Sequence, residues 1–267
     1  MKRNNLEKLL AKVRGGGYAL GVVTTFSDAA VTELVADAGF DFVWIDGEHG
    51  SMDRTVAERH LMAVNGSDCA SLYRVPACDH TEIKRIVDYA PAGVIVPMVL
   101  TAEDAARAVS ACRYPIHGGE RGCSFRRQVG YGAESVADYL VQSAGEPLVI
   151  VQLEHIEAVR NLDAILSVPG VDAVFVGQYD LAMSMGKPGQ WHDPEVAAVL
   201  DESCRKVRAA GKILGVYAEG DFGRWMRRGV QCFAIKCDYN ALLLGLDRMR
   251  EEFGSAAGAP PGPRGGS

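Results

Sequence analysis

Residues 38–50 read A-G-F-D-F-V-W-I-D-G-E-H-G, and the pattern in this stretch decides the fold. The run 42–45 is apolar at every position, which is typical of a parallel strand that is covered on both faces. Gly39 stands just before it, where a glycine commonly closes a helix. A stretch of helical period resumes at residue 54. This segment is therefore predicted to be one buried strand between two helices.

The same strand-then-helix unit recurs along the chain. Strands are predicted at 20–24, 42–46, 71–75, 93–97, 148–154, 173–177, 213–218 and 232–236. Helices are predicted at 27–38, 54–65, 81–89, 102–112, 156–167, 194–210, 222–228 and 240–253. Eight such units in succession predict a single (β/α)8 TIM barrel of the α/β class. An open doubly wound sheet is the alternative, but it rarely contains eight units this regular.

The length of the chain agrees with one barrel. Its 267 residues lie close to the about 250 that such a barrel commonly has. We expect the barrel to cover residues 1–253 and the Pro/Gly-rich stretch 254–267 to be a disordered tail. One connection, 114–145, is longer than the others and contains another short helical stretch at 135–143. A connection of this length in a compact domain is usually functional or lies at a subunit contact.

Composition narrows the class of protein. The net charge of −6 argues against a nucleic acid or an anionic membrane as partner, because both select for basic surfaces. No apolar run approaches the roughly 20 residues that span a bilayer. The seven cysteines are odd in number, irregularly spaced and without a C-x-x-C pair, so we expect neither a disulfide framework nor a zinc cluster. Reduced cysteines suggest the cytoplasm.

Ionisable residues gather at the C-terminal ends of the predicted strands, where (β/α)8 enzymes build their sites. The first group is D-G-E-H, which puts two carboxylates and the imidazole of His49 within four residues. It is either a general base with an orienting partner or a solvated loop. Arg74 ends the third strand. It either holds an oxyanion or a carboxylate of a substrate, or forms a structural ion pair with Asp46 or Glu48.

Two more carboxylates follow neighbouring strands, Glu154 in V-Q-L-E and Asp180 in V-G-Q-Y-D-L. Such a pair can bind one hard divalent cation and leave positions open for water and substrate oxygens. The alternative is that each acid caps a helix. Arg121, in G-G-E-R-G of the long connection, either positions a substrate carboxylate or anchors that loop. Lys236 is the only lysine near a strand end, so it is the residue to check for a Schiff base.

Taken in order, these motifs resemble the metal-dependent pyruvate aldolases of the HpcH/HpaI type, which include the 2,4-dihydroxyhept-2-ene-1,7-dioate and 2-dehydro-3-deoxyglucarate aldolases. The resemblance runs from about residue 20 to residue 253. It is carried by A-G-F-D-F-V-W-I-D-G-E-H, R-V-P with Asp88 further on, V-I-V-P-M-V, R-Y-P…G-E-R-G, V-Q-L-E and G-V-D-A-V-F-V-G-Q-Y-D-L-A. That set is specific for the family and less specific for a reaction within it.

The resemblance implies a barrel of the phosphoenolpyruvate/pyruvate type and a role for each matching residue. Glu154 and Asp180 would bind the divalent metal, which would be Mg²⁺, Mn²⁺ or Co²⁺. Arg74 would touch the C2 oxygen of a small 2-oxo acid, and His49 would be the acid/base, oriented by Asp88. The remaining substrate contacts would come from Gln152, Gln178, Tyr179 and Arg121. The family also implies a homo-oligomer, usually a hexamer built from dimers that exchange their last helix.

The implied activity is that of a lyase, a class II aldolase that acts on 4-hydroxy-2-oxo acids through a pyruvate enolate. Two departures concern the second substrate: Gln178 and Tyr179 replace smaller residues, and G-V-V-T-T-F at 21–26 lacks a tryptophan common at the end of strand one. With the arginine-rich R-G-C-S-F-R-R, the first departure motivates an alternative, which is condensation of oxaloacetate with acetyl-CoA, as in a citrate synthase, or decarboxylation of oxaloacetate. A binding barrel without catalysis is a third hypothesis, but it gives no reason for so coherent a set of residues.

Overall fold

The computed structural model describes residues 5–124 and 126–257. Phe125 of the arginine-rich loop and residues 258–267 of the predicted tail lie outside the described residues. Eight parallel strands close into a barrel in sequence order, which confirms the predicted (β/α)8 fold. The strands are β1 (Ala19–Thr24), β2 (Phe42–Asp46), β3 (Ala70–Arg74), β4 (Gly93–Val96), β5 (Leu148–Leu153), β6 (Ala173–Val176), β7 (Ile213–Tyr217) and β8 (Cys232–Cys237).

The helices around the barrel follow the predicted ones closely. They are α2 (Ala30–Asp37), α3 (Arg54–Ala63), α4 (His80–Val87), α5 (Ala102–Cys112), α6 (Val136–Gln142), α7 (Ile156–Arg160), α8 (Leu162–Ser167), α10 (Pro194–Ala209) and α11 (Phe222–Arg227), with short 3-10 turns at Pro115–His117, Arg127–Gly132 and Ser143–Gly145. The helix predicted at 156–167 is broken into α7 and α8. The break lies at Asn161, whose side-chain amide donates to the carbonyl of Leu100 at 2.9 Å.

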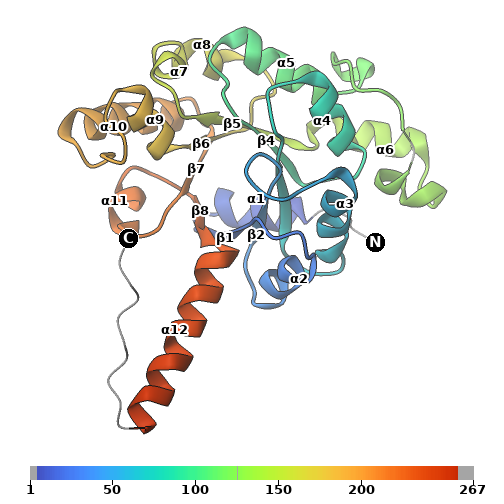
Figure 1. Ribbon diagram of the computed structural model, residues 1–267. Helices are drawn as coiled ribbons and strands as arrows, with labels where there is room; N and C mark the ends of the chain where they lie inside the picture. The colour runs from blue at the N-terminus through green and yellow to red at the C-terminus, as the bar shows by residue number, and fades with distance from the viewer. Residues whose placement is uncertain (1–4, 125, 258–267) are drawn as a thin grey trace.

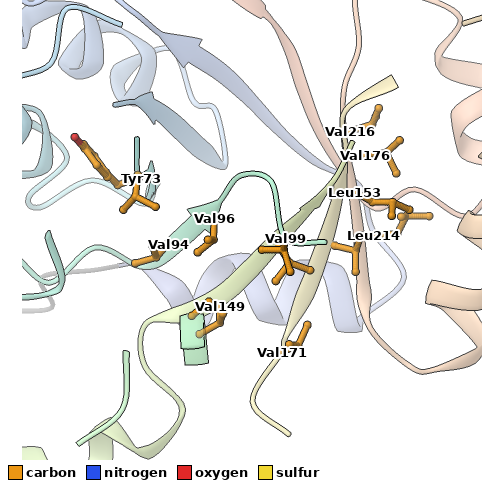
Figure 2. Packing of buried hydrophobic residues seen from close by; sticks show 14 of the residues in the cluster. Tyr73, Val94, Val96, Val99, Val149, Leu153, Val171, Val176, Leu214 and Val216 are labelled. Carbon is orange, nitrogen blue, oxygen red and sulfur yellow. The ribbon is translucent and has the colours of Figure 1, made fainter. Parts of the chain in front are cut away.

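Alternate residues of each strand face opposite sides of the sheet. On β4 and β5, Val94, Val96 and Val149 face outward and pack under the surrounding helices as part of the larger hydrophobic cluster (Figure 2). Ile95 and Ile150, one position along, face into the barrel and belong to a second cluster. The wholly apolar strands are thus explained, because both of their faces are buried.

Aromatic rings fill the middle of the barrel because glycines make room for them. A Cβ at Gly21 would lie 2.3 Å from the ring of Phe42, and one at Gly215 would lie 2.2 Å from the ring of Phe175. Trp44 is the next residue of β2 that faces inward, and the centre of its ring lies 5.5 Å from that of Phe175. Side chains therefore close the barrel interior below its C-terminal end.

Helix α1 (Leu6–Arg14) is not among the predicted helices, and it covers the other end of the barrel. Leu6, Leu9 and Val13 pack into the inner cluster. The carbonyl of Val13 accepts from the side chain of Gln231, which directly precedes β8. The polar N-terminal stretch therefore closes the barrel at the strand starts and leaves only the C-terminal end open.

The last helix, α12 (Asp238–Ala256), projects away from the barrel (Figure 1). It includes residues 254–256, which the sequence assigns to the tail. Large apolar side chains are exposed along it, including Leu244 at 57%, Met249 at 66% and Phe253 at 76%. These side chains are therefore left largely uncovered by the part of the chain that the structure describes.

All seven cysteines are free, as their irregular spacing predicts. No helix within residues 5–124 and 126–257 has the length and hydropathy needed to cross a membrane.

Candidate active site

The polar residues of the site occupy the last inward-facing positions of the strands. Asp46 ends β2, Arg74 ends β3 beside it in register, and Gln152 is the last inward-facing residue of β5. Here the apolar filling of the barrel stops and a cavity of about 460 Å³ begins. The cavity is lined by Val23, Thr25, Trp44, Asp46, His49, Arg74, Gln152, Val176, Gly177, Gln178, Tyr179, Asp180, Tyr217, Glu219, Cys237 and Tyr239.

Arg74 is held rigidly in the floor of this cavity. Its Nε and Nη2 atoms donate to the two carboxylate oxygens of Asp46 at 2.9 and 2.6 Å. Its Nη1 lies 2.7 Å from Glu48 Oε2 and 3.4 Å from Gln152 Oε1. Although burial alone would lower it, the pKa of Arg74 is raised by the hydrogen bonds and charge of Asp46 and by the charges of Glu48 and Glu154. The guanidinium is therefore always charged and fixed in orientation.

Glu154 directly follows β5 and is only 4% exposed. Its Oε1 accepts from the amide of Met98 at 2.7 Å, and its Oε2 accepts from the side chain of Gln152 at 2.8 Å. Gly177 packs closely against it, because a Cβ there would lie 2.7 Å from Glu154 Cβ. The carboxylate is thus fixed from two sides.

The surroundings of Glu154 make its negative charge costly without a cation. Burial is the largest cause that raises the pKa of Glu154 to about 7, and the negative charges of Glu48 and Asp180 raise it further. Burial likewise raises the pKa of Glu48. Asp180 lies one turn into α9 (Gln178–Ser184) and is exposed. Carboxylates that repel one another across a confined space suit a hard divalent cation.

Within the described residues, no three His, Cys, Asp or Glu side chains form a group that could hold a metal ion by themselves. A site with two protein carboxylates is nevertheless ordinary for Mg²⁺, which keeps several positions for water or substrate oxygens. The structure therefore fits an open metal site at Glu154 and Asp180 rather than a closed cage.

His49 lines the mouth of the cavity, and its side chain is 70% exposed. Its Nε2 lies 3.8 Å from Glu48 Oε2. Its backbone amide and that of Glu48 donate to Asp46 Oδ1 at 3.2 and 3.0 Å, which folds the D-G-E-H loop over the end of β2. The imidazole is thus free to reach a molecule inside the cavity.

Asp88 and Arg121 lie elsewhere. Asp88 closes α4, and α4 starts at the site end of the barrel, so its last residue lies toward the opposite end. Burial raises the pKa of Asp88, while the charge of Arg121 opposes that effect. Arg121 is 2% exposed, donates to the carbonyl of Val87 at 2.9 Å and stacks 4.4 Å above the ring of Tyr114. Two roles were predicted for Arg121, positioning a substrate carboxylate and anchoring the long loop. These contacts fit the second role.

Gln178 and Tyr179 both line the cavity, in different ways. The side chain of Gln178 is buried and donates to the carbonyl of Tyr217 at 2.7 Å, which ties the start of α9 to the end of β7. Tyr179 reaches the mouth, where its hydroxyl lies 3.5 Å from Glu219 Oε2. The amides of residues 178–180 are the first of a helix, and such amides have no partner within the helix.

Sequence reasoning assigned no role to Tyr217, Glu219, Cys237 and Tyr239, although they line the cavity. Alternation along β7 is the signal that could have found Tyr217, because it stands two positions after the inward-facing Gly215. Lys236 is not among the lining residues. It lies in the irregular part of β8, with a positive φ of 69°. Within the described residues no lysine lines the cavity, and thus none is placed for a Schiff base.

Comparisons with known proteins show the family to which the chain is related. The profile of the HpcH/HpaI aldolase/citrate lyase family matches residues 21–233. A 4-hydroxy-2-oxovalerate aldolase of Rhodococcus jostii strain RHA1 is 36% identical over 257 residues, which cover 95% of this chain and 97% of that protein. A 5-keto-4-deoxy-D-glucarate aldolase of Salmonella arizonae is 35% identical over 236 residues, covering 88% and 91%. A crystal structure of the citrate synthase SbnG superposes with a TM-score of 0.83 at 25% identity, covering 96% and 99%.

Proposed function

The chain belongs to the HpcH/HpaI aldolase/citrate lyase family, and we propose that its cavity binds a divalent cation and cleaves or forms a 4-hydroxy-2-oxo acid through the enolate of pyruvate. Aldolase relatives at 36% and 35% identity along most of the chain make it a carbon–carbon lyase. Those two relatives are named for different substrates, so the family alone leaves the second substrate open.

One observation carries the proposal: the buried carboxylate of Glu154 is held by the Met98 amide and by Gln152, which also contacts the fixed guanidinium of Arg74. The charges of Glu48 and Asp180 add to burial in raising the pKa of Glu154. Glu154 and Asp180 would hold Mg²⁺, Mn²⁺ or Co²⁺. When bound, such an ion supplies Lewis acidity toward the carboxylate and keto oxygens of a 2-oxo acid. Glu154, Gln152 and Arg74 are already held in place by hydrogen bonds, and such preorganisation is what stabilises developing charge.

The chain's own residues account for the remaining steps. The guanidinium of Arg74 holds the C2 oxygen, on which negative charge develops as the C3–C4 bond breaks. Gln152, which contacts both Arg74 and Glu154, orients the oxo acid between them. His49 accepts the proton of the C4 hydroxyl as the aldehyde leaves. A proton then returns to C3, which yields pyruvate. The first amides of α9 hold the substrate carboxylate.

We also propose that the protein works as a homo-oligomer. The exposed apolar side chains of α12, among them Leu244, Met249 and Phe253, form a surface that water disfavours. A second copy of the chain could cover them by exchanging this helix, which is a common route to dimers. Asp88 lies away from the cavity of its own chain. The contact predicted between Asp88 and His49 would therefore join Asp88 of one copy to His49 of a neighbouring copy.

The direct test is aldol cleavage of 4-hydroxy-2-oxovalerate, with the release of pyruvate measured before and after treatment with EDTA. We expect chelation to abolish cleavage, and Mg²⁺, Mn²⁺ or Co²⁺ to restore it. The Asp180→Asn variant should require more metal for half-maximal activity. Asp163→Asn on α8, an exposed aspartate away from the cavity, is the matched control and should behave as the wild type. Cleavage that persists at full rate without metal would contradict the proposal.

The likeness to a solved citrate synthase favours one second candidate, the condensation of oxaloacetate with acetyl-CoA. Two of the three loop arginines lend it no support, because Arg121 and Arg127 are buried and donate to backbone carbonyls. Incubation with oxaloacetate, with and without acetyl-CoA, separates the possibilities. Citrate would favour the synthase, and pyruvate without citrate would indicate decarboxylation.

A further inference from the structure

The cavity has two sides that differ in chemistry. The ends of β2, β3 and β5 and the loops after them contribute Asp46, His49, Arg74 and Gln152, which are the groups assigned to the oxo acid. The ends of β7, β8 and β1 contribute the other side, with Tyr217, Glu219, Cys237, Tyr239 and Thr25. The two sides face each other because β7, β8 and β1 are consecutive in the closed barrel.

Pyruvate bound at the first side would fill only part of the cavity and leave the second side unoccupied. Pyruvate has six non-hydrogen atoms, and if each took a water molecule's share of about 30 Å³, together they would need less than half of the 460 Å³. The remaining space lies against the side formed by β7, β8 and β1. A second substrate that meets the enolate must enter there.

Hydrogen bonds on this side converge on one carboxylate. The hydroxyl of Tyr217 donates to Glu219 Oε1 at 2.8 Å, and the hydroxyl of Tyr179 lies 3.5 Å from Glu219 Oε2. Cys237 Sγ lies 3.7 Å from the same Tyr217 hydroxyl. Both phenol hydroxyls donate to Glu219, and its carboxylate keeps lone pairs for a further donor.

Within the described residues, this side of the cavity has no lysine or arginine. Arg74, the basic residue that lines the opposite side, is already paired with Asp46 and Glu48. A carboxylate on the second substrate would meet Glu219 without a counter-ion, and like charges brought together at a binding site are costly. A hydroxyl group could instead donate to Glu219 and accept from a phenol.

On the premise of the proposed aldolase function, we propose that Tyr179, Tyr217 and Glu219 form the subsite for the aldehyde and select an uncharged hydroxyaldehyde over an aldehyde that bears a carboxylate. Glu219 accepts from the hydroxyls of the aldehyde and repels an acid. The ring of Tyr179, which lies 6.5 Å from that of Tyr217, bounds the subsite at the mouth. This side therefore determines specificity and takes no part in forming the enolate.

The test compares aldehydes on one enzyme. With Mg²⁺ and pyruvate, kcat/KM is measured for D-glyceraldehyde, for propanal, which lacks hydroxyls, and for succinic semialdehyde, which carries a carboxylate. We expect D-glyceraldehyde to be the best acceptor and succinic semialdehyde the poorest. The Glu219→Gln variant keeps the size of the side chain and removes its charge, so the ratio of kcat/KM for succinic semialdehyde to that for D-glyceraldehyde should rise about tenfold.

Two further variants make the result specific. Tyr217→Phe, which removes a donor to Glu219, should lower kcat/KM for D-glyceraldehyde more than for propanal. Glu202→Gln on α10, an exposed glutamate paired only with Arg205, is the matched control and should leave the aldehyde ratio unchanged. A wild-type preference for succinic semialdehyde, or an unchanged ratio in Glu219→Gln, would overturn the inference.

Exchange of the C3 hydrogens of pyruvate with deuterated water needs no aldehyde, so it reports the enolate alone. Metal-dependent exchange in the wild type, together with no discrimination among the aldehydes, would leave the aldolase function in place and overturn only the subsite. Absence of exchange would overturn the proposed function and, with it, the inference.

Discussion

Replacement of Gly177 by alanine should displace Glu154 and thereby weaken metal binding. The backbone at Gly177 has a φ of −98°, which alanine can adopt. A Cβ there would nevertheless lie 2.7 Å from Glu154 Cβ and 3.0 Å from its Oε2. Carbon atoms pack best at about 3.5–4.0 Å, and the Cβ of Glu154 is bonded directly to its backbone. Glu154 must therefore shift by about 1 Å together with its main chain after β5.

That displacement gives the size of the effect. Metal–ligand distances hold to within about 0.2 Å, and a shift of this size at a catalytic group costs about 100-fold in rate. We expect the affinity of Gly177→Ala for Mn²⁺ to fall about 10- to 100-fold, as it does when the support of a ligand is altered. The value of kcat/KM for pyruvate release should fall by about 100-fold.

The assay is a titration with Mn²⁺ in which the free ion is followed by electron paramagnetic resonance, alongside kinetics at saturating metal. Gly145→Ala is the matched control, because a Cβ at Gly145 meets nothing within 4 Å. Circular dichroism should show the same secondary structure for both variants. If Gly177→Ala bound Mn²⁺ as tightly as the wild type, Glu154 would not be the ligand, and the reasoning for the metal site would fail.

Three other perturbations test separate parts of the structure. Asp46→Asn leaves Glu48 as the one carboxylate paired with Arg74 among the described residues. The free energy of unfolding in urea should therefore fall by about 3 kcal/mol, and a loss below about 1 kcal/mol would contradict the buried pair. Phe253→Asp puts a charge on the apolar face of α12, and analytical ultracentrifugation should then show a smaller assembly; an unchanged sedimentation coefficient would count against that interface. Burial lowers the pKa of His60 from 6.5, so the unfolded chain binds the extra proton and stability falls as the pH drops below 6.5. The melting temperature of His60→Asn should therefore depend less on pH in that range, and an equal dependence would exclude His60 as the cause.

The fold and the centre of the candidate site could be predicted from the sequence for the same reason. Strands that are buried on both faces are apolar throughout, so the positions where polar residues begin mark their ends. Asp46, Arg74 and Gln152 stand at such ends, and a parallel barrel brings all of its strand ends to one rim. Local pattern together with that one geometric rule was therefore enough to bring together the residues assigned to the oxo acid.

The other parts of the candidate site could not be predicted, because they depend on where residues distant in sequence lie in the folded chain. Arg121 stands in a motif that suits either a substrate or an anchor, and only the position of the ring of Tyr114 and the carbonyl of Val87 distinguishes the two. Asp88 closes a helix, and the end of the barrel where it lies follows from the direction of α4. No role was assigned to Tyr217 and Glu219, because the proposed role depends on their hydrogen-bonded cluster with Tyr179, which is distant in sequence. Helix α12 has an ordinary sequence, and only its projection from the barrel leaves its apolar side chains uncovered.

The balance of charge favours a cation in the proposed site. Among the described residues, Arg74 is the only lysine or arginine that lines the cavity, and its charge is already paired with Asp46 and Glu48. Buried Glu154 and exposed Asp180 have no salt bridge to a lysine or arginine among the described residues, and the acid substrate brings another negative charge to the same place. Buried charges without partners are strongly disfavoured. In the proposed site, a divalent cation held by Glu154 and Asp180 would supply the missing positive charge near the oxo acid. Arg74 would then be left to stabilise the negative charge that develops on the enolate.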